Sequence, residues 1–316
     1  MQLVQVREAY RAGGLAAVAG QAGADGQVWF YAALLAYAAQ DRAGALRAAR
    51  EAARRDPSSL VFRYAAAYLE RAGGQTTAVY DSAAAFGAFI RGGGNVPLYA
   101  ALSDTLRAIY RDYEQLRLLD IGVGDGLALL PALPAAPTTL DLVEPSAALL
   151  EHTVAALAAR GVEPRVFAGT LQAFARVVRP RQPWHIAQAT FSLQSIIPTE
   201  RPALLRWLRA RTERLLLAEF DPPAACADPL DPVCAAHVIA RYEQGLAEYE
   251  QGGDLVAQGF LMPVMLGYVD PTAARTNYEQ PIAGWQSDLL AAGFSQVRAI
   301  PLHDYWWASA YLLDAS

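Results

Sequence analysis

Three glycines follow directly on an apolar segment that is typical of a buried strand. Residues 116–127 read LRLLDIGVGDGL, so Gly122, Gly124 and Gly126 come between this segment and an expected helix. Glycine lets backbone amides approach a ligand closely, and the start of a helix favours negative charge. Glu144 ends the next apolar segment, and an acid at that place typically accepts hydrogen bonds from ribose hydroxyls. The pattern therefore indicates a ligand that contains a nucleoside.

The spacing of the glycines distinguishes between classes of nucleoside ligand. Enzymes that bind dinucleotides use G-x-G-x-x-G, because the third glycine lets helix and strand pack closely over a pyrophosphate. In this sequence Leu127 occupies that third position, and Asp120 precedes the glycines. A carboxylate repels pyrophosphate but suits a ligand that carries an amino group and a sulfonium.

With these residues the sequence resembles the class I S-adenosylmethionine-dependent methyltransferases, over roughly residues 80–316. Residues 120–126 (DIGVGDG) match the first motif of that family, and Glu144 matches its ribose-binding acid. Residues 185–196 (HIAQATFSLQSI) resemble the motif of the fourth strand, and 285–294 (WQSDLLAAGF) the late helix before a terminal hairpin. These motifs also follow one another in the order that the family has.

The resemblance implies S-adenosylmethionine as the cofactor. The residues expected to bind it lie in the glycine motif, at strand ends and near the start of the domain: Asp120, Gly122, Gly124, Gly126, Glu144, Thr170, Leu171, Ala189, Thr190 and Tyr80. The sequence departs from the family at His185, where the fourth strand often starts with an aspartate, and at Gln194-Ser195, where a histidine pair is frequent. It also has Thr170-Leu171 where the family often has an acid after the third strand. The acceptor chemistry therefore stays open.

Few residues are candidates for acting on a methyl acceptor. Methyl transfer from a sulfonium depends mainly on alignment of the two partners, and a general base adds to it. His303 and His237 are the candidate bases, with a hydrogen-bonded structural histidine as the alternative for each. We expect Gln194, Asp221 and Tyr268 to contact the substrate.

Aromatic side chains form a further group of candidates. They can enclose a cationic methyl or an aromatic acceptor, and the alternative is ordinary core packing. The members are Tyr80, Phe86, Tyr99 and residues 305–307.

The order of the predicted elements gives the fold class. Strands alternate with helices up to residue 220, which predicts a Rossmann-like, mostly parallel sheet, and the last two strands lie too close for a helix between them and predict an antiparallel edge hairpin. The seven strands are expected at 116–121, 139–143, 165–167, 185–190, 215–220, 297–302 and 307–313. The class is α/β with an all-α region in front.

Two domains are expected, a helical region at 1–78 and a methyltransferase domain at 79–316 with a cap insertion at about 222–280. The helical region resembles a tetratricopeptide helix pair at a few positions: Trp29, Ala33, Ala45, Ala52 and Pro57. A generic alanine-rich bundle is the alternative.

Composition excludes several kinds of chemistry. The 316 residues have a net charge of −5, and all 26 basic residues are arginines, so a P-loop lysine or a Schiff-base lysine is excluded. We expect neither nucleic acid nor a membrane as a partner, because the arginines are not clustered and no apolar run is long enough to span a bilayer. Cys226, Cys234 and His237 form a fragment of a zinc pattern without a clear fourth ligand, so no metal is expected.

These observations favour a cytoplasmic methyltransferase acting on an O or N nucleophile of a small molecule, plausibly in secondary metabolism. A peptide or protein acceptor captured by the helical front and a scaffold without turnover are the alternatives, and an NAD-linked dehydrogenase ranks behind them. A homodimer is left open.

Overall fold

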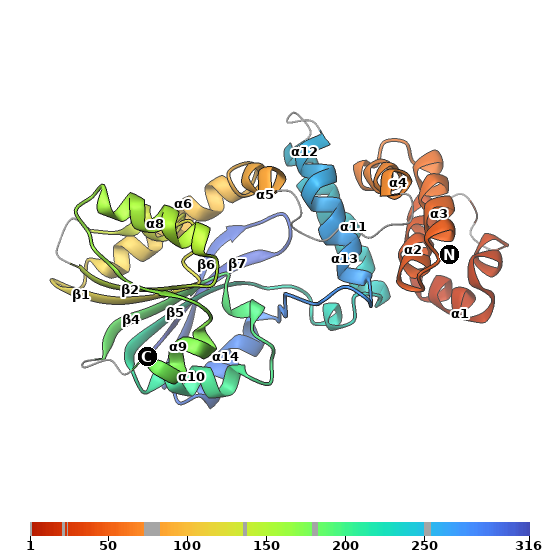
Figure 1. The fold of residues 1–316 in the computed structure, drawn as a ribbon. Helices are drawn as coiled ribbons and strands as arrows, with labels where there is room; N and C mark the ends of the chain where they lie inside the picture. Colours follow the sequence, from red (N-terminus) through yellow and green to blue (C-terminus); the bar gives the residue numbers. More distant parts are fainter. Residues whose placement is uncertain are drawn as a thin grey trace. The chain divides into compact units, whose positions relative to one another are not determined.

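The chain divides into two compact units. A computed structural model describes residues 2–20, 23, 25–72, 83–134, 138–178, 183–249 and 254–316 (Figure 1). The first unit combines Met1–Val96 with Pro223–Arg275, and the second combines Pro97–Pro222 with Thr276–Ser316.

The second unit is built on a seven-stranded sheet in the order β3-β2-β1-β4-β5-β7-β6. Its strands are β1 (Leu116–Ile121), β2 (Thr138–Glu144), β3 (Arg165–Ala168), β4 (Trp184–Thr190), β5 (Thr212–Phe220), β6 (Val297–Asp304) and β7 (Ser309–Ala315). The first five are parallel, and β7 pairs antiparallel with both β5 and β6. This confirms the predicted fold class, including the antiparallel edge pair.

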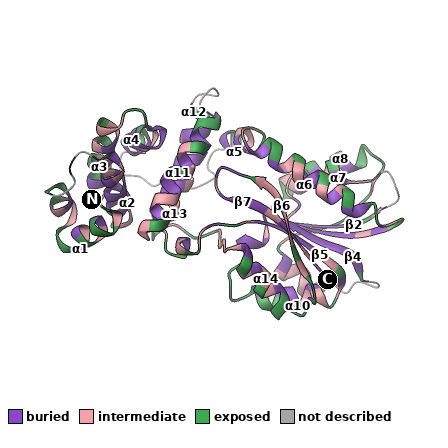
Figure 2. Ribbon diagram, turned by 180° about the vertical axis from the view of Figure 1, so that it is seen from behind, coloured by how far each residue is buried: buried purple, intermediate pink, exposed green. Residues whose placement is uncertain are grey.

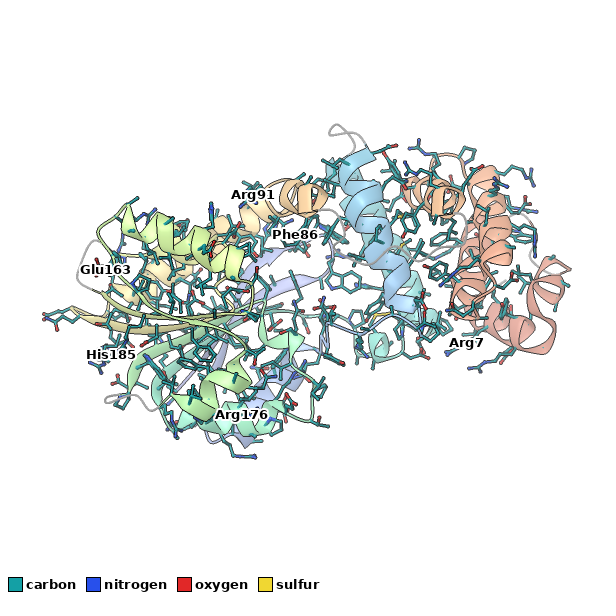
Figure 3. All side chains as sticks on the ribbon, viewed as in Figure 1. Arg7, Phe86, Arg91, Glu163, Arg176 and His185 are labelled. Atoms are coloured by element: carbon teal, nitrogen blue, oxygen red, sulfur yellow. A yellow bond between two sulfur atoms is a disulfide. The ribbon has the colours of Figure 1, made fainter. Side chains whose placement is uncertain are left out.

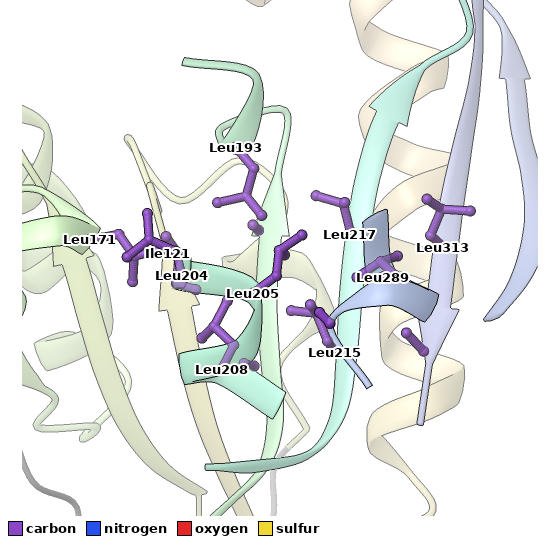
Figure 4. Packing of buried hydrophobic residues seen from close by; sticks show 14 of the residues in the cluster. Ile121, Leu171, Leu193, Leu204, Leu205, Leu208, Leu215, Leu217, Leu289 and Leu313 are labelled. Atoms are coloured by element: carbon purple, nitrogen blue, oxygen red, sulfur yellow. The ribbon is translucent and has the colours of Figure 1, made fainter. Parts of the chain in front are cut away.

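Helices cover both faces of the sheet, which explains why its central strands are largely buried on both sides (Figure 2). One face carries α6 (Asn95–Tyr110), α7 (Leu129–Ala132) and α8 (Ala147–Ala158). The other carries α9 (Leu171–Val177), α10 (Arg201–Arg209) and α14 (Ile282–Ala291). In Figure 4, leucines of α10 and α14 pack on Leu215 and Leu217 of β5 and Leu313 of β7.

The register places the ends of all these strands along one edge. Ile121 pairs with Val143 on one side and with Ala189 on the other, so β1, β2 and β4 end together. At the far side Ala310 of β7 pairs with both Phe220 of β5 and His303 of β6. The carboxyl ends of the parallel strands therefore share an edge with the turn between β6 and β7. Ligands of open α/β sheets bind at such an edge, and we call it the ligand edge.

The first unit is all helical. It contains α1 (Leu3–Ala19), α2 (Gly26–Ala38), α3 (Arg42–Arg55), α4 (Leu60–Ala72), α5 (Ala83–Ile90), the one-turn η2 (Ala224–Ala227), α11 (Pro232–Tyr249), α12 (Asp254–Val256), η4 (Ala257–Leu261) and α13 (Met262–Val269). The alanines expected at close helix contacts, Ala33, Ala45 and Ala52, are all buried. This burial also fits a generic helical bundle, so the tetratricopeptide assignment stays a prediction.

The insertion after β5 packs on the N-terminal helices, and the units therefore divide differently from the expected domains at 1–78 and 79–316. The Glu243 carboxylate of α11 accepts hydrogen bonds from the amides of Leu60 and Val61 at 2.6 and 3.1 Å, and so caps the start of α4. Arg42 forms an ion pair with the buried Asp270 at 2.7 Å. Residues 223–275 thus share a core with the helical front.

Two further observations bear on the sequence expectations. Cys226 and Cys234 are joined by a disulfide, so the two thiols of the zinc fragment are not available as ligands in this state. Within the described ranges, no helix is long and apolar enough to cross a membrane.

Candidate functional site

The turn after β1 is held by its neighbours on both sides. Gly122 has a φ of +70° and donates its amide hydrogen to the Val143 carbonyl of β2 at 2.7 Å. On the other side, Ser192 donates from its hydroxyl to the Ile121 carbonyl at 2.6 Å. A Cβ on Gly122 would lie 2.5 Å from the Cβ of Ser192, which is closer than two carbons can approach. Glycine is therefore required here by both backbone conformation and space.

Glu144, the acid at the end of β2, connects this turn with the next helix. One carboxylate oxygen accepts from the Gly124 amide at 3.0 Å and the other from the Ser146 amide at 2.8 Å. The Thr153 hydroxyl of α8 donates to the Gly124 carbonyl at 2.8 Å. Each carboxylate oxygen has two lone pairs, so Glu144 keeps acceptor capacity for ligand hydroxyls while it fixes the turn.

Asp120, the last but one residue of β1, belongs to a buried polar chain that the sequence analysis missed. Gln188 of β4 donates to one Asp120 oxygen at 2.7 Å, and the Tyr110 hydroxyl of α6 donates to the Gln188 side-chain carbonyl. The other oxygen, Oδ1, has no hydrogen-bond partner among the described residues. The signal available in the sequence was a glutamine within the otherwise apolar fourth strand.

Burial decides the charge state of Asp120. Removal from water raises the pKa of this carboxyl to about 7, the negative charge of Glu144 adds to the effect, and the Gln188 hydrogen bond opposes it. An unpaired carboxyl oxygen in an apolar surrounding is costly. A cation that reached Oδ1 would satisfy this oxygen and favour the carboxylate form.

The other residues predicted to bind the cofactor differ in what their side chains do. Thr170 caps α9, because its hydroxyl accepts from the Ala173 amide at 3.2 Å. The side chains of Leu171 and Ala189 are buried in the core, so only their backbone groups can meet a ligand. Thr190 ends β4 at the ligand edge and is half-buried. Tyr80 lies outside the described residues.

Gln194 lies in the turn that follows β4, at the same edge. The backbone amide of Gln194 donates to a carboxylate oxygen of Glu219 at 3.1 Å, and the side-chain nitrogen donates to the Phe191 carbonyl at 3.2 Å. Glu219 is 1% exposed, and burial, followed by the charge of Glu279, raises the pKa of its carboxyl well above the usual value. Glu219 thus holds the turn that presents Gln194.

The remaining predicted substrate residues are divided between the two units. Asp221 follows β5 and accepts from the amide of Ile282 at 2.8 Å, so it holds the start of α14. Tyr268 belongs to the helical unit, where its hydroxyl donates to the Cys226 carbonyl at 2.9 Å.

The candidate bases are divided in the same way. His303 is half-buried on β6 at the ligand edge, and His237 lies on α11 of the helical unit. His185, labelled in Figure 3, is the second residue of β4 and lies at the opposite edge, where its ring stacks on that of Tyr113 with centroids 5.2 Å apart. Of the four histidines, His303 is thus the one that the sheet itself places at the edge of the glycine turn.

The helical unit contains a cavity of about 470 Å³. Its lining includes three carboxylates, Asp25, Asp56 and Glu243, together with the apolar side chains of Phe62 and Ile239. None of the predicted site residues lines it. In the part of the chain that the structure describes, no three His, Cys, Asp or Glu side chains gather as a metal site requires.

Comparison with known proteins gives a likeness in three-dimensional structure alone. No model of a protein family matches the chain, and no curated protein does. A magnesium protoporphyrin IX methyltransferase from Synechocystis PCC 6803, solved with bound S-adenosylhomocysteine, is 16% identical over 79% of this chain and 92% of its own, with a TM-score of 0.46. A candidate O-methyltransferase from Nostoc punctiforme PCC 73102 is 16% identical over 67% of this chain, with a TM-score of 0.45. The match covers 55% of the Nostoc protein.

A third similar structure is a mycolic acid cyclopropane synthase complexed with S-adenosylhomocysteine. It is 11% identical over 64% of this chain and 78% of its own, with a TM-score of 0.42. All three TM-scores lie below 0.5, so these likenesses decide nothing about the function of this chain.

The close approach of Gly122 and Ser192 makes a testable prediction about the glycine turn. Gly161 has nearly the same φ, +71° against +70°, but open space where its Cβ would lie. We expect Gly161→Ala to lower the free energy of unfolding by about 1–2 kcal/mol from backbone strain alone. Gly122→Ala adds the collision and should cost about 1–3 kcal/mol more, measured by chemical denaturation.

Replacing the colliding partner is the control. In the Ser192→Gly background the collision is absent. There Gly122→Ala should lower the free energy of unfolding only by the backbone strain, about as much as Gly161→Ala does in the wild-type protein. Equal losses for the two alanine variants would contradict the view that Ser192 forces glycine at position 122.

Proposed function

We propose that this chain is an S-adenosylmethionine-dependent methyltransferase, with the cofactor bound at the edge formed by β1, β2 and β4. The observation that carries the proposal is the pair of carboxylates beside the glycine turn. Glu144 borders the turn with spare acceptor capacity, and Asp120 has a buried oxygen without a partner among the described residues. The first suits ribose hydroxyls and the second suits an ammonium group.

The residues present fit this cofactor in two respects. Its amino group would give Asp120 Oδ1 the hydrogen-bond donor that it lacks. The glycine turn leaves room beside the Gly124 backbone, where no atom lies within 4 Å of an added Cβ. Glu144 is 93% buried, so its ribose bonds would form largely out of water and be correspondingly selective.

The same geometry argues against a dinucleotide. A pyrophosphate is usually bound at the start of a long helix, and α7 is a four-residue helix that begins only at Leu129. Asp120 and Glu144 would both repel its charge. In addition, β7 lies antiparallel between β5 and β6, whereas the dinucleotide fold has a parallel 3-2-1-4-5-6 order.

When bound, the cofactor supplies an electrophilic methyl group on a sulfonium. The side chains of this unit contribute binding and orientation: Asp120 and Glu144 fix the cofactor, and Gln194 faces the acceptor side. His303 is our candidate for accepting a proton from an O or N nucleophile, because its strand brings it to the same edge. We propose a small molecule as the acceptor, with a role in secondary metabolism as the broader setting.

A peptide or protein acceptor is the second candidate. The observation that favours it is the acidic cavity of the helical unit, whose lining suits a basic segment. A scaffold that binds the cofactor without turnover is the third. The prediction of a cytoplasmic location accompanies the first proposal.

Calorimetric titration with S-adenosylhomocysteine tests the proposal directly. We expect this ligand to bind and NAD to bind at least about tenfold more weakly. Glu144→Ala should weaken the binding of S-adenosylhomocysteine by about tenfold to hundredfold, because hydrogen bonds to a buried charge are lost. Glu163→Ala, which removes an exposed acid between α8 and β3, is the matched control and should change nothing.

The control ligands separate ribose contacts from damage to the turn. Wild-type protein should prefer adenosine to 2′,3′-dideoxyadenosine, and Glu144→Ala should lose that preference. A preference that persists in the variant would remove Glu144 from the ribose site, and preferred binding of NAD would overturn the cofactor assignment.

The raised pKa of Asp120 predicts a pH dependence of binding. With a pKa of about 7, part of the ligand-free population holds a neutral carboxyl that cannot pair with an ammonium group. The affinity for S-adenosylhomocysteine should therefore rise about tenfold between about pH 6 and about pH 8, as the carboxylate forms. Titrations at several pH values measure this slope.

Asp120→Asn keeps the shape of the side chain and the bond from Gln188 but removes the titration. We expect this variant to bind weakly and with a flat pH profile. An unchanged slope in Asp120→Asn would show that another group produces the dependence.

A further inference from the structure

Four aromatic rings form a continuous row in the sheet unit. Phe191 stacks on Phe220 with centroids 4.6 Å apart and an interplanar angle of 22°. Phe220 stacks on Tyr305 at 5.2 Å and 25°, and Tyr99 meets Phe191 edge to face at 6.1 Å. We call Tyr99, Phe191, Phe220 and Tyr305 the aromatic row. Its members come from α6, the turn after β4, the end of β5 and the turn between β6 and β7, so the fold and not one local segment assembles it.

The row begins beside the glycine turn and leads away from it along the ligand edge. Phe191 directly follows β4, which pairs with β1, and the next residue, Ser192, contacts Gly122. At Tyr99, burial and then the charge of Asp125, a residue of the glycine turn, raise the pKa of the phenol. A flat molecule on this row would therefore lie next to a ligand held by the turn.

The backbone at Phe191 is unusual for a residue with a side chain. Its φ is +53°, a conformation that L-residues rarely adopt, and its amide donates to the Ala218 carbonyl at 2.9 Å. Such strained positions persist where the surroundings fix them and are concentrated at functional sites. At Phe191 the strained backbone carries a ring that stacks nearly parallel on the ring of Phe220.

One polar atom next to the row is buried and has no partner among the described residues. Gln194 is 91% buried, and its side-chain nitrogen donates to the Phe191 carbonyl. Because that carbonyl can only accept, the amide orientation is fixed and Oε1 is the atom left over. The Glu219 carboxylate holds the backbone amide of Gln194, so Oε1 is also fixed in position. It can accept a hydrogen bond from a ligand and cannot donate one.

We propose that the methyl acceptor is a planar aromatic molecule bearing a hydroxyl or an amine, that its ring lies along the aromatic row, and that its polar hydrogen is bound by Gln194 Oε1. This inference rests on the proposed function and specifies the substrate class of the same site. Phe191 and Tyr305 both stack on Phe220, so the row presents ring edges to an added molecule. Edge-to-face contacts select a flat aromatic ring over a saturated one of equal size. The oxygen of Gln194 selects molecules that carry a donor, because only these satisfy its acceptor.

Binding of three related compounds to the full chain tests both parts of the proposal. The probes are 2-naphthol, decahydro-2-naphthol, which is of similar size but not flat, and 2-methoxynaphthalene, which is flat but has no donor. Calorimetry with and without saturating S-adenosylhomocysteine measures each affinity. We expect 2-naphthol to bind at least about tenfold more tightly than the saturated alcohol and about fivefold to tenfold more tightly than the ether.

Variants then assign these preferences to residues. Phe220→Leu should reduce the preference for 2-naphthol over its saturated analogue by about threefold to tenfold. Trp207→Leu is the matched control, since it removes another half-buried ring of the unit, next to Trp184 at the start of β4. Gln194→Leu should lower the affinity for 2-naphthol to that for 2-methoxynaphthalene, and should leave the affinity for 2-methoxynaphthalene unchanged. Circular dichroism confirms that each variant is folded.

The outcomes keep the inference separate from the proposed function. If S-adenosylhomocysteine does not bind, the proposed function fails, while the naphthol preferences still test the row. If it binds but 2-naphthol and decahydro-2-naphthol bind equally, or Phe220→Leu behaves like Trp207→Leu, the acceptor assignment fails and the methyltransferase proposal stands.

Discussion

The hydrogen bonds of the Glu144 carboxylate are the interaction on which the site depends. One side chain fixes the turn after β1 through the Gly124 amide and the start of α8 through the Ser146 amide. Three consecutive parts of the chain, β1 with its turn, β2 and α8, are thereby held at one point of the sheet edge. The acid that would recognise a ligand also shapes the surface that receives it. Little ordering therefore remains to be done when the ligand binds.

A second constraint acts through the sheet. Asp120 is kept in an apolar surrounding by β1 and β4. One oxygen of its carboxyl is held by the chain that runs from Tyr110 through Gln188, and Oδ1 has no hydrogen-bond partner among the described residues. Folding therefore leaves one acceptor unsatisfied and holds the carboxyl near the pH at which it changes charge. Binding of a cation would relieve both effects. The turn after β4 repeats this arrangement at Gln194, which Glu219 holds in place with an oxygen to spare.

Much of the fold could be predicted because its signals are local. Each expected strand is an apolar segment bounded by polar or turn residues, and β1 begins and ends where it was predicted, at Leu116 and Ile121. Glu144 was recognised from its place after the second strand. The partners Gln188 and Ser192 were missed, because they reach the site through crossover connections whose register no local pattern specifies.

The grouping of the helices was also beyond a local reading. Residues 223–275 follow a strand of the sheet, yet Glu243 bonds to the start of α4 and Asp270 forms an ion pair with Arg42 of α3. An apolar helix face indicates that a partner exists but not which element it is. For the same reason the sequence offered the aromatic residues as candidates without showing that Tyr99 and Tyr305, 206 positions apart, belong to one row.

We propose that Glu144 and Asp120 hold two parts of one cofactor, its ribose and its amino group, beside the glycine turn. A crystal structure of the complex with S-adenosylhomocysteine would show both contacts. We expect ribose hydroxyls within hydrogen-bond distance of the Glu144 carboxylate and the amino group within hydrogen-bond distance of Asp120 Oδ1. A ligand bound elsewhere, or bound here with its ribose directed away from Glu144, would contradict it.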